Sequence, residues 1–530
     1  MATYHLGPME ADVAQYDFPA VARPRRFPLR AGDLLAHAAR VHADRRVVSI
    51  SRDGEAQETD YAHLQTLASS RALQLMTMEL RPGDRIASIG DSSIEQLAWL
   101  YGALQAGVIT HLVNPQHEAA HVHALLMRAG VRLVLHDAHH EALSESLAQA
   151  MGVPALAMSV PNMAATPPDS TVTFNLPEFD ECAPSHVCYS SGTTGLPKIV
   201  EYTHRALVLH AWGCALPGAL ALTGRDRVMP LMQLYHANAW GAPFVCPLVG
   251  AELVLCPPVR DPAFWHAAAE RHGVTVLAAV TAHWLALLQY CGATGQRFSS
   301  LRRTVVAGTR MPVAVARGIA QGLSVAVSHA WGMTETSPLA TIEHFDPADD
   351  RLAHGQPVFG VEVRTTGEGA LAELQVRGHW IACREPSLDG WLSTGDLATI
   401  DARARVDVID RIGDVVRHGA GAVSSALVEF EARTVGGVAD AALLPGDDVD
   451  ARTTLAWVAA GDADAAHAED RLRSHLAAAF DGWVPDRIVA TGPLPYTPSA
   501  KVQKHKLRER IRNEDGSGAL RSAMVNEGQA

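Results

Sequence analysis

A ten-residue stretch, Tyr189–Lys198, constrains this chain more than any other part of its sequence. It reads YSSGTTGLPK and combines serine and threonine hydroxyls with two glycines and a lysine. Glycine lets backbone N–H groups approach an anion closely, hydroxyls donate hydrogen bonds to phosphate oxygens, and lysine adds a positive charge. Because Pro197 precedes the lysine and Ile199 follows it, this is not the ordinary P-loop, in which Gly-Lys-Ser/Thr runs straight into a helix. The alternative to a phosphate-binding loop is a plain surface turn.

Four more motifs follow in order along the chain. They are HAWGMTETS at His329–Ser337, WLSTGD at Trp391–Asp396, the dipeptide Asp410–Arg411, and PYTPSAK at Pro495–Lys501. With the first stretch, they resemble the motif set of the acyl-adenylate-forming (ANL) superfamily, within its fatty-acid and acyl-CoA synthetase-like branch of AMP-dependent ligases. The resemblance covers about residues 25–512 and implies an ATP-dependent enzyme.

The length of 530 residues exceeds what one hydrophobic core usually organises, so at least two domains are expected. Helical patterns alternate with short apolar runs, which predicts an α/β fold with parallel strands and crossover helices. The predicted strands are 85–89, 131–135, 251–255 and 274–277; the predicted helices are 34–40, 425–433 and 465–479.

The domain boundary is predicted at the fourth motif. Residues 1–410 are expected to form a large amino-terminal adenylation domain of several subdomains, and residues 411–530 a small α+β carboxy-terminal cap. The resemblance implies that the active site lies between them and that the cap is mobile. Residues 1–24 and the tail 513–530 are expected to be extended and frayed.

The resemblance assigns ATP phosphates and magnesium to two motifs. Glu335 is the expected Mg²⁺ ligand, although a carboxylate there could instead simply cap a helix start. Thr334 is expected to donate its hydroxyl to the α-phosphate. The residues expected around the β- and γ-phosphates are Ser190, Ser191, Gly192, Thr193, Thr194, Gly195 and Lys198.

The nucleoside is expected to bind at the neighbouring motifs. Trp331 occupies the position against which adenine stacks, and Gly332 and Met333 follow it in the same site. Asp396 follows a Thr-Gly turn and is expected to accept hydrogen bonds from the ribose hydroxyls; taken alone, it could be an ordinary turn aspartate. Arg411 is the expected second ribose contact.

Lys501 is the residue expected to catalyse adenylation, because an ammonium group can bridge the substrate carboxylate and the α-phosphate. Ala500 replaces the family's usual glycine and should stiffen that loop. In the segment YHANAWG, His236 is expected to gate the second substrate and Trp240 to bound the acyl pocket. The alternative for Trp240 is a buried aromatic residue with a satisfied N–H.

Three departures from the family pattern concern the pocket and the second reaction step. Beside Gly308 and Thr309, Arg310 stands where relatives carry a small residue. A desolvated guanidinium needs a partner, so Arg310 should meet a polar group of the acid or a neighbouring acidic side chain, unless it points to solvent. Gly413 is unusual at the junction, and residues 419–425 lack the family's glutamate and tryptophan, which weakens the case for ordinary CoA delivery.

The predicted function is an acid–CoA ligase that uses ATP and Mg²⁺. An ATP-dependent amide ligase, similar to those that join coronafacic acid to amino acids, is the alternative. A non-catalytic acyl- or nucleotide-binding relative and transfer to a carrier protein remain open. The expected partners are a small carboxylic acid with CoA or an amine, and a homodimer is an open expectation.

The composition excludes several other classes. The formal charge of −13 argues against a nucleic-acid surface, and no apolar run approaches the ~20 residues of a membrane helix. The seven cysteines form no Cys-x-x-Cys pair. We therefore expect reduced thiols in a cytoplasmic protein without stable membrane insertion.

Overall fold

The computed structural model describes most of the chain but omits both ends and several internal segments. The described residues are 27–159, 176–190, 198–367, 371–382, 389–418, 421–446, 451–461, 467–496 and 502–514. The expected N-terminal arm, most of the tail, the centre of the phosphate loop and Lys501 lie outside these ranges.

One large sheet has six strands, in which β3, β4, β5, β6 and β7 run parallel and β8 pairs antiparallel to β7. Every residue of β4 is buried, as expected for a parallel strand covered on both faces. The strands, in spatial order, are β6 (Ala155–Ala157), β5 (Val131–His136), β3 (Arg85–Ile89), β4 (Ile109–Val113), β7 (Pro184–Ser190) and β8 (Lys198–Thr203).

A second large sheet has nine strands with a parallel centre and antiparallel strands at its two ends. The strands, in spatial order, are β15 (Gln356–Pro357), β14 (Thr341–His344), β13 (Ala326–Trp331), β12 (Arg303–Ala307), β11 (Val276–Val280), β9 (Arg227–Pro230), β10 (Glu252–Leu255), β1 (Arg46–Ile50) and β2 (Ala56–Asp60).

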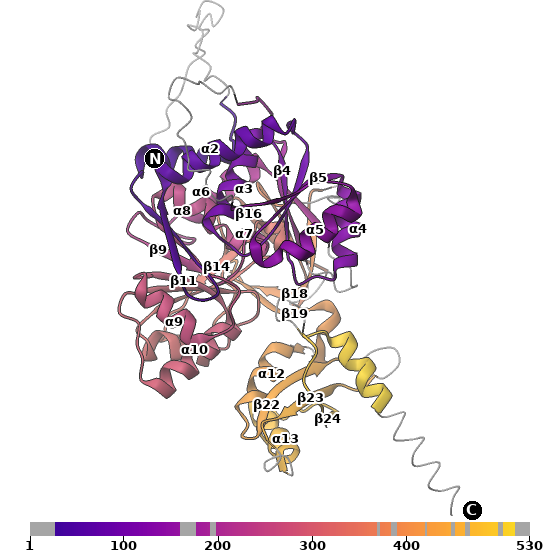
Figure 1. The fold of residues 1–530 in the computed structure, drawn as a ribbon. Coiled ribbons are helices and arrows are strands. Elements are labelled where there is room, and N and C mark those ends of the chain that lie inside the picture. Colours follow the sequence, from indigo (N-terminus) through magenta and orange to yellow (C-terminus); the bar gives the residue numbers. More distant parts are fainter. Residues whose placement is uncertain are drawn as a thin grey trace, which may run out of the picture.

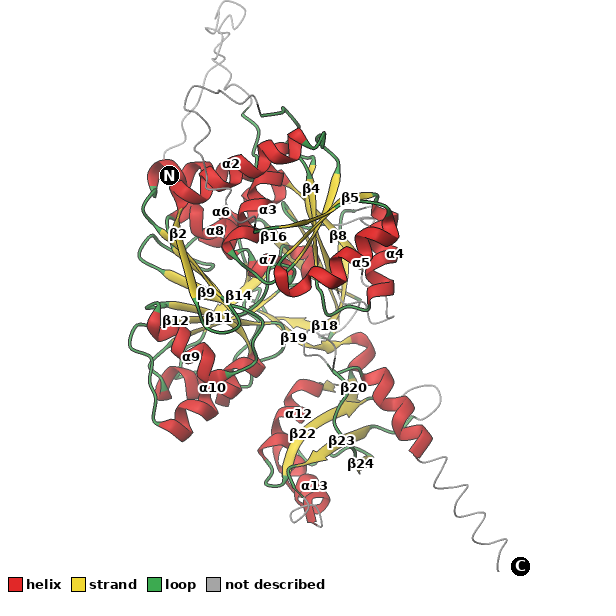
Figure 2. Cartoon of the chain, viewed as in Figure 1, coloured by secondary structure: helices red, strands yellow, loops and turns green. Residues whose placement is uncertain are grey.

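Helices pack around these two sheets (Figure 2). The long α3 shows why they form where they do: Ser93 caps its N-terminus by accepting from the Gln96 N–H, and Gly107 ends it in the left-handed conformation. The helices are α1 (Gly32–Val41), α2 (Tyr61–Thr77), α3 (Ile94–Ala106), α4 (Ala119–Ala129), α5 (Glu141–Met151), α6 (His204–Ala215), α8 (Ala242–Val249), α9 (Pro262–Arg271), α10 (Thr281–Thr294) and α11 (Val313–Arg317).

The remaining strands belong to smaller sheets. An antiparallel sheet contains β16 (Val361–Thr366), β17 (Ala372–Gly378), β18 (Leu392–Ile400) and β19 (Val406–Arg411). Figure 1 shows the C-terminal elements gathered into a smaller body next to β18 and β19. These elements are β20 (Val416–His418), β21 (Gly421–Val423), α12 (Ser425–Thr434), β22 (Val438–Leu444), β23 (Thr454–Ala459), α13 (Ala468–Ala479), β24 (Arg487–Ala490) and a helix over residues 504–514.

The predicted α/β fold, with large N-terminal sheets and a small C-terminal sheet, is confirmed. The strand expected at 274–277 is found at β11, Val276–Val280. Thr275 lies before the strand, where its hydroxyl accepts a hydrogen bond from the Arg227 N–H, and the strand continues through the small residues Ala278 and Ala279. Within the described ranges, no helix is long and apolar enough to cross a membrane.

Candidate active site

The ends of the predicted phosphate loop lie opposite each other. Ser190 is the last residue of β7, Lys198 is the first of β8, and the two are paired in register. From Val200 to Tyr202, β8 alternates between core and surface, because Val200 and Tyr202 are buried and Glu201 is exposed; Lys198 is exposed at the start of the strand. The other predicted loop residues, Ser191, Gly192, Thr193, Thr194 and Gly195, lie outside the described residues.

The WGMTE motif forms a tight turn at the end of β13. A Cβ at Gly332 would lie 1.5 Å from the Pro338 carbonyl oxygen, so only glycine fits. The Met333 N–H then donates to Thr336 Oγ1 over 2.9 Å, and residues Thr334–Thr336 make a short 3₁₀ helix. The turn therefore fixes the backbone of Thr334 and Glu335 relative to Trp331 at the end of β13.

Tyr202 joins this turn to the strands that flank the phosphate loop. Its hydroxyl donates to the Thr334 carbonyl oxygen over 2.6 Å, and its side chain is fully buried. The expected phosphate strand and the expected metal motif are therefore tied by a direct hydrogen bond.

Asp396 is held by two residues that were also predicted for the nucleoside. Trp331 Nε1 lies 3.0 Å from Asp396 Oδ2, and Arg411 Nε lies 3.0 Å from Oδ1. Arg411 also donates to the Thr394 carbonyl oxygen over 2.7 Å. Only 5% of Asp396 is exposed. Two donors from distant parts of the chain therefore hold this carboxylate in one orientation.

Glu335 lies in a mixed electrostatic environment. Burial raises its pKa above the usual value, and the nearby Asp396 acts in the same direction; Arg411 and Lys198 act to lower it. A half-buried carboxylate surrounded by these charges is a hard oxygen donor, which suits a Mg²⁺ ion that takes its other ligands from phosphates and water. The residues present therefore fit the predicted metal.

The YHANAWG segment adopts an unusual backbone. Ala237, Asn238, Ala239 and Trp240 all have positive φ angles, between 43° and 59°, and Gly241 continues with 77°. Left-handed backbone costs an L-residue about 1–2 kcal/mol, so the surrounding structure must hold this turn, labelled α7 (Ala237–Trp240), in place. The turn separates His236 from Trp240, which packs against a buried apolar cluster.

The loop after β12 contains the three predicted pocket residues. Gly308 has φ 91°, and the carbonyl oxygen of Thr309 lies 3.4 Å from His329 Nε2. Arg310 forms a bidentate pair with Asp407, with distances of 2.6 and 2.9 Å, and donates to the Val408 carbonyl oxygen over 2.8 Å. Of the partners expected for the guanidinium, the structure thus provides the neighbouring acidic side chain. The alternative of an arginine directed to solvent is wrong.

A partly buried ionic cluster includes Asp410 of the junction motif. The Ser425 N–H donates to Asp410 Oδ2 over 2.6 Å, and Lys504 Nζ lies 3.4 Å from Glu429 and 3.7 Å from Asp414. Burial raises the pKa of Asp410 to about 6, although the positive charge of Lys504 acts against that rise.

Sequence reasoning missed several residues at this site: Tyr202, Asn238, Asp407 and Lys504. None carried a local signal, because the contacts of each are with residues distant in the chain.

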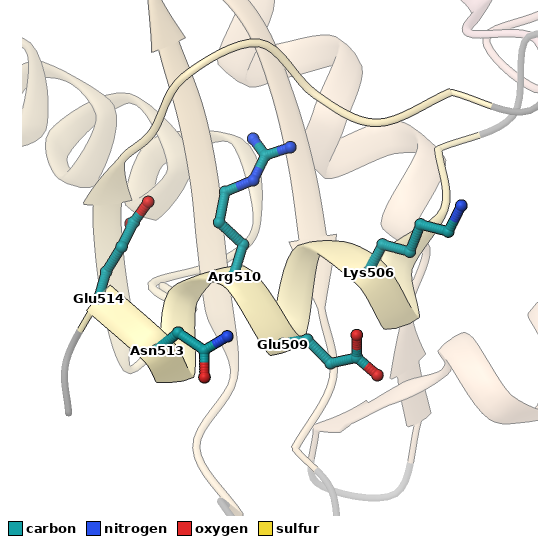
Figure 3. A pocket seen from close by; sticks show the side chains of 5 residues that line it. All are labelled: Lys506, Glu509, Arg510, Asn513 and Glu514. Carbon is teal, nitrogen blue, oxygen red and sulfur yellow. The ribbon is translucent and has the colours of Figure 1, made fainter. Parts of the chain in front are cut away.

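A hollow of about 550 Å³ lies along the helix 504–514 (Figure 3). Its lining is Lys506, Glu509, Arg510, Asn513 and Glu514, so none of the predicted site residues forms it.

The fold and these contacts define a site with two carboxylates. Glu335 is half-buried beside positive charges, and the buried Asp396 lies between the Trp331 ring and Arg411. The chain belongs to the AMP-binding enzyme family, whose sequence model matches residues 35–382.

Relatives are similar over almost their whole length. A medium-chain-fatty-acid–CoA ligase of Ectopseudomonas oleovorans is 31% identical, over 92% of this chain and 96% of the relative. A 3-methylmercaptopropionyl-CoA ligase of Ruegeria pomeroyi is 32% identical over 92% and 98% of the two chains. A long-chain-fatty-acid–CoA ligase of Thermus thermophilus is 30% identical over 91% and 96%.

Solved structures agree with the fold. The crystal structure of an anthranilate CoA ligase in complex with anthranoyl-AMP superposes with a TM-score of 0.81 at 21% identity, covering 92% of this chain and 99% of that one. An O-succinylbenzoate CoA synthetase from Bacillus subtilis, in complex with ATP and magnesium ion, gives 0.75 at 22% identity, covering 91% and 99%.

Proposed function

We propose that this protein is an AMP-forming acid–CoA ligase. It activates a carboxylic acid with ATP, releases pyrophosphate, and transfers the acyl group from the adenylate to CoA with release of AMP. The observation that carries the proposal is the arrangement of Asp396, which is held by Trp331 and Arg411 close to Glu335. The CoA-ligase names of three relatives, each matched over at least 96% of its length, support the acceptor.

In this proposal, the protein positions two anions rather than supplying a base. The acid's carboxylate is already a nucleophile, so the task is to hold it against the α-phosphate and to stabilise charge as pyrophosphate leaves. Lys198, with the serines and threonines before it, holds the β- and γ-phosphates, and Thr334 contacts the α-phosphate. Glu335 holds Mg²⁺, which when bound neutralises phosphate charge.

The nucleoside and the catalytic lysine complete the assignment. Adenine stacks on Trp331 beside Gly332 and Met333, while Asp396 and Arg411 bind the ribose. The indole N–H supports this role for Asp396, because it orients the carboxylate before any sugar binds. Lys501 is proposed to bridge the acid and the α-phosphate, from the sequence motif alone.

The acid is proposed to be an aliphatic one without a second charged group. Asp407 already engages both terminal nitrogens of Arg310, so that guanidinium has no need of a substrate anion. The pocket is assigned to His236, Trp240, Gly308 and Thr309, of which Trp240 packs against apolar side chains. Medium- and long-chain fatty acids, named for two relatives, are the first acids to try.

The proposal extends to the domain arrangement, the location and the oligomeric state. We place the boundary between the adenylation domain and the cap at residues 410/411, and we propose that the cap rotates between the two steps. A cytoplasmic location and a homodimer are proposed on the same footing.

The experiment is a competition between acceptors. The purified protein, ATP, Mg²⁺ and an acid from a panel are incubated with CoA and glycine at equal concentration, and products are identified by mass. Acyl-CoA with stoichiometric AMP is the expected result. Acyl-glycine without acyl-CoA would instead establish an amide ligase and make the altered 419–425 loop its sequence signature. Release of no AMP with any acid would remove the proposal.

A further inference from the structure

Four buried side chains form a polar cluster between the phosphate-loop strands and the YHANAWG segment. We call His186, Cys188, Tyr202 and Asn238 the buried polar cluster; all four are fully buried. His186 Nε2 lies 2.6 Å from Asn238 Oδ1, and the Cys188 thiol donates to the same oxygen over 3.4 Å. The side chain of Asn238 is therefore attached to β7, the strand that enters the phosphate loop.

His186 is a rigid, uncharged donor in this cluster. Burial lowers its pKa to about 3, so the imidazole is neutral at ordinary pH. Its ring stacks on Tyr202 with centroids 4.8 Å apart and contacts Phe244 at 5.9 Å. Because Asn238 Oδ1 can only accept, the proton of the neutral ring is on Nε2. The ring therefore cannot turn away without losing both its stacking and its hydrogen bond.

The left-handed turn Ala237–Trp240 needs such an anchor. Its main-chain hydrogen bonds are local: the N–H groups of Asn238, Ala239 and Gly241 donate to the carbonyl oxygens of Leu234, His236 and Asn238, so none of these bonds attaches the turn to β7. Asparagine tolerates this backbone better than alanine or tryptophan does. Asn238 is the one residue of the turn with a polar side chain able to both accept and donate. Among the described residues, its Nδ2 has no hydrogen-bond acceptor. Burying this unpaired donor costs free energy, so the protein keeps Asn238 here despite a loss of stability.

We propose that Asn238 is the positioning residue of the YHANAWG segment. By attaching the turn to His186 and Cys188, it fixes where Trp240 lies and thereby which length of acid the pocket accepts. This inference rests on the proposed function, since it takes Trp240 as the pocket wall. At the opposite end of the cluster, the Tyr202 hydroxyl donates to the Thr334 carbonyl oxygen. Tyr202 therefore positions the turn proposed to bind the nucleotide rather than the pocket proposed to bind the acid.

The main test is N238G, with A239G as the matched control. Glycine adopts left-handed backbone freely, so N238G removes the anchoring amide without adding strain, and A239G relieves strain without removing an anchor. Acid-dependent exchange of pyrophosphate into ATP, which needs no CoA, is measured with butyric, octanoic and dodecanoic acids. We expect N238G to change the ratio of kcat/KM between the longest and shortest acid by about tenfold or more, the scale on which pockets discriminate methylenes. The KM for ATP should change less than about twofold for both variants, because neither touches the ATP residues.

A second variant removes the same hydrogen bond from its other side, so that a result does not depend on whether N238G folds. H186F keeps an aromatic ring in the stack but removes the donor to Asn238, so its acid profile should shift as that of N238G does. The double variant should add little, since both remove one attachment. Y202F should raise the KM for ATP and leave the acid ratio unchanged. Thermal unfolding of each variant separates lost stability from altered specificity.

Specific outcomes would overturn the inference. An N238G enzyme with the acid ratio of the wild type, or one whose losses are equal for every acid and for ATP, makes Asn238 an ordinary core residue. Shifts in H186F and N238G that simply add would show that the two side chains do not act together. A wild-type protein that activates no acid would reject the proposed function, whereas normal acid activation with an unshifted N238G ratio rejects this inference alone.

Discussion

The indole nitrogen of Trp331 donates a hydrogen bond to the carboxylate of Asp396 over 3.0 Å, which joins the residue assigned to adenine with the residue assigned to ribose. Only 7% of Trp331 and 5% of Asp396 are exposed, so water competes weakly for this bond. The carboxylate is consequently oriented by the protein before the nucleotide arrives, and less ordering has to occur on binding.

Replacing Trp331 by phenylalanine should weaken ATP binding while an aromatic ring remains for stacking. Because the bond is present before ATP binds, its loss adds to binding only the cost of ordering the Asp396 side chain, about 0.5–1.5 kcal/mol, so the KM for ATP should rise about 2- to 10-fold. The KM for the acid should stay close to that of the wild type. W265F is the control, because Trp265 donates to the Val259 carbonyl oxygen elsewhere in the fold. An unchanged KM for ATP in W331F would show that the indole N–H has no part in nucleotide binding.

Glu335→Gln should abolish or greatly weaken the Mg²⁺-dependent first step. The amide retains the size of the side chain but removes the negative charge that a hard cation prefers. Pyrophosphate release measured across a Mg²⁺ titration checks this. Glu362, which pairs with Arg377 on the surface, provides E362Q as a control that should titrate as the wild type does. The same Mg²⁺ dependence in E335Q would end its assignment as the ligand.

Lys501→Ala should lower adenylation by at least about 100-fold, since one preorganised charge contact often stabilises a transition state by about 3–4 kcal/mol. Added acyl-adenylate should still be converted to acyl-CoA. Lys506, on the exposed face of the last helix in Figure 3, provides K506A as the control with near-normal rates. Near-normal pyrophosphate release by K501A would exclude Lys501 from the mechanism.

Arg310→Ala should destabilise the protein without selecting between acids. Removing the guanidinium leaves the half-buried Asp407 without its bidentate partner and with only His354, whose Nδ1 lies 3.7 Å from Oδ1. Losses of about 1–3 kcal/mol are expected when a hydrogen-bonded partner is removed from a buried charge. The double variant R310A/D407A should recover part of this loss, which a double-mutant cycle measures by thermal unfolding. A selective loss with keto or polar acids, but not with aliphatic acids of the same size, would contradict this prediction and make Arg310 a substrate contact.

Asp410 should make stability depend on pH between about 4 and 6. Its pKa is raised to about 6 by burial, so the folded protein holds this proton more tightly than the unfolded chain does. The stabilising effect of the proton is present below the unfolded value of about 4 and is lost as pH rises through 6. D410N keeps an acceptor for the Ser425 N–H but cannot ionise, so its melting temperature should vary less over this range. Parallel pH curves for D410N and wild type would disprove the prediction.

Much of the site could be predicted because its motifs are local. The turn around Gly332 is determined by residues within six positions, and the strand 85–89 is found with the bounds predicted from its apolar run. The order of the motifs along the chain then identified the family. These signals are properties of short segments, which a single sequence displays directly.

The rest depends on contacts between distant segments. Arg310 and Asp407 are 97 residues apart, and His186 and Asn238 are 52 apart. The sequence indicated that Arg310 needs a partner, because burying an unpaired charge is costly, but not which carboxylate would be nearby. Likewise, the left-handed backbone at Ala237–Trp240 could not be expected from alanines, which normally avoid it.

Strand β8 has a consequence for how the active site can vary between proteins. Lys198 begins the strand and Tyr202 follows four positions later, where its hydroxyl reaches the Thr334 carbonyl oxygen. A strand advances about 3.3 Å per residue, so β8 sets a spacing of about 13 Å between Lys198, proposed to bind phosphate, and Tyr202, which contacts the turn that contains Glu335. Residues inserted before Lys198 leave this length unchanged. One residue inserted between Lys198 and Tyr202 would turn the tyrosine to the opposite face of the strand and break its hydrogen bond to the Thr334 carbonyl oxygen.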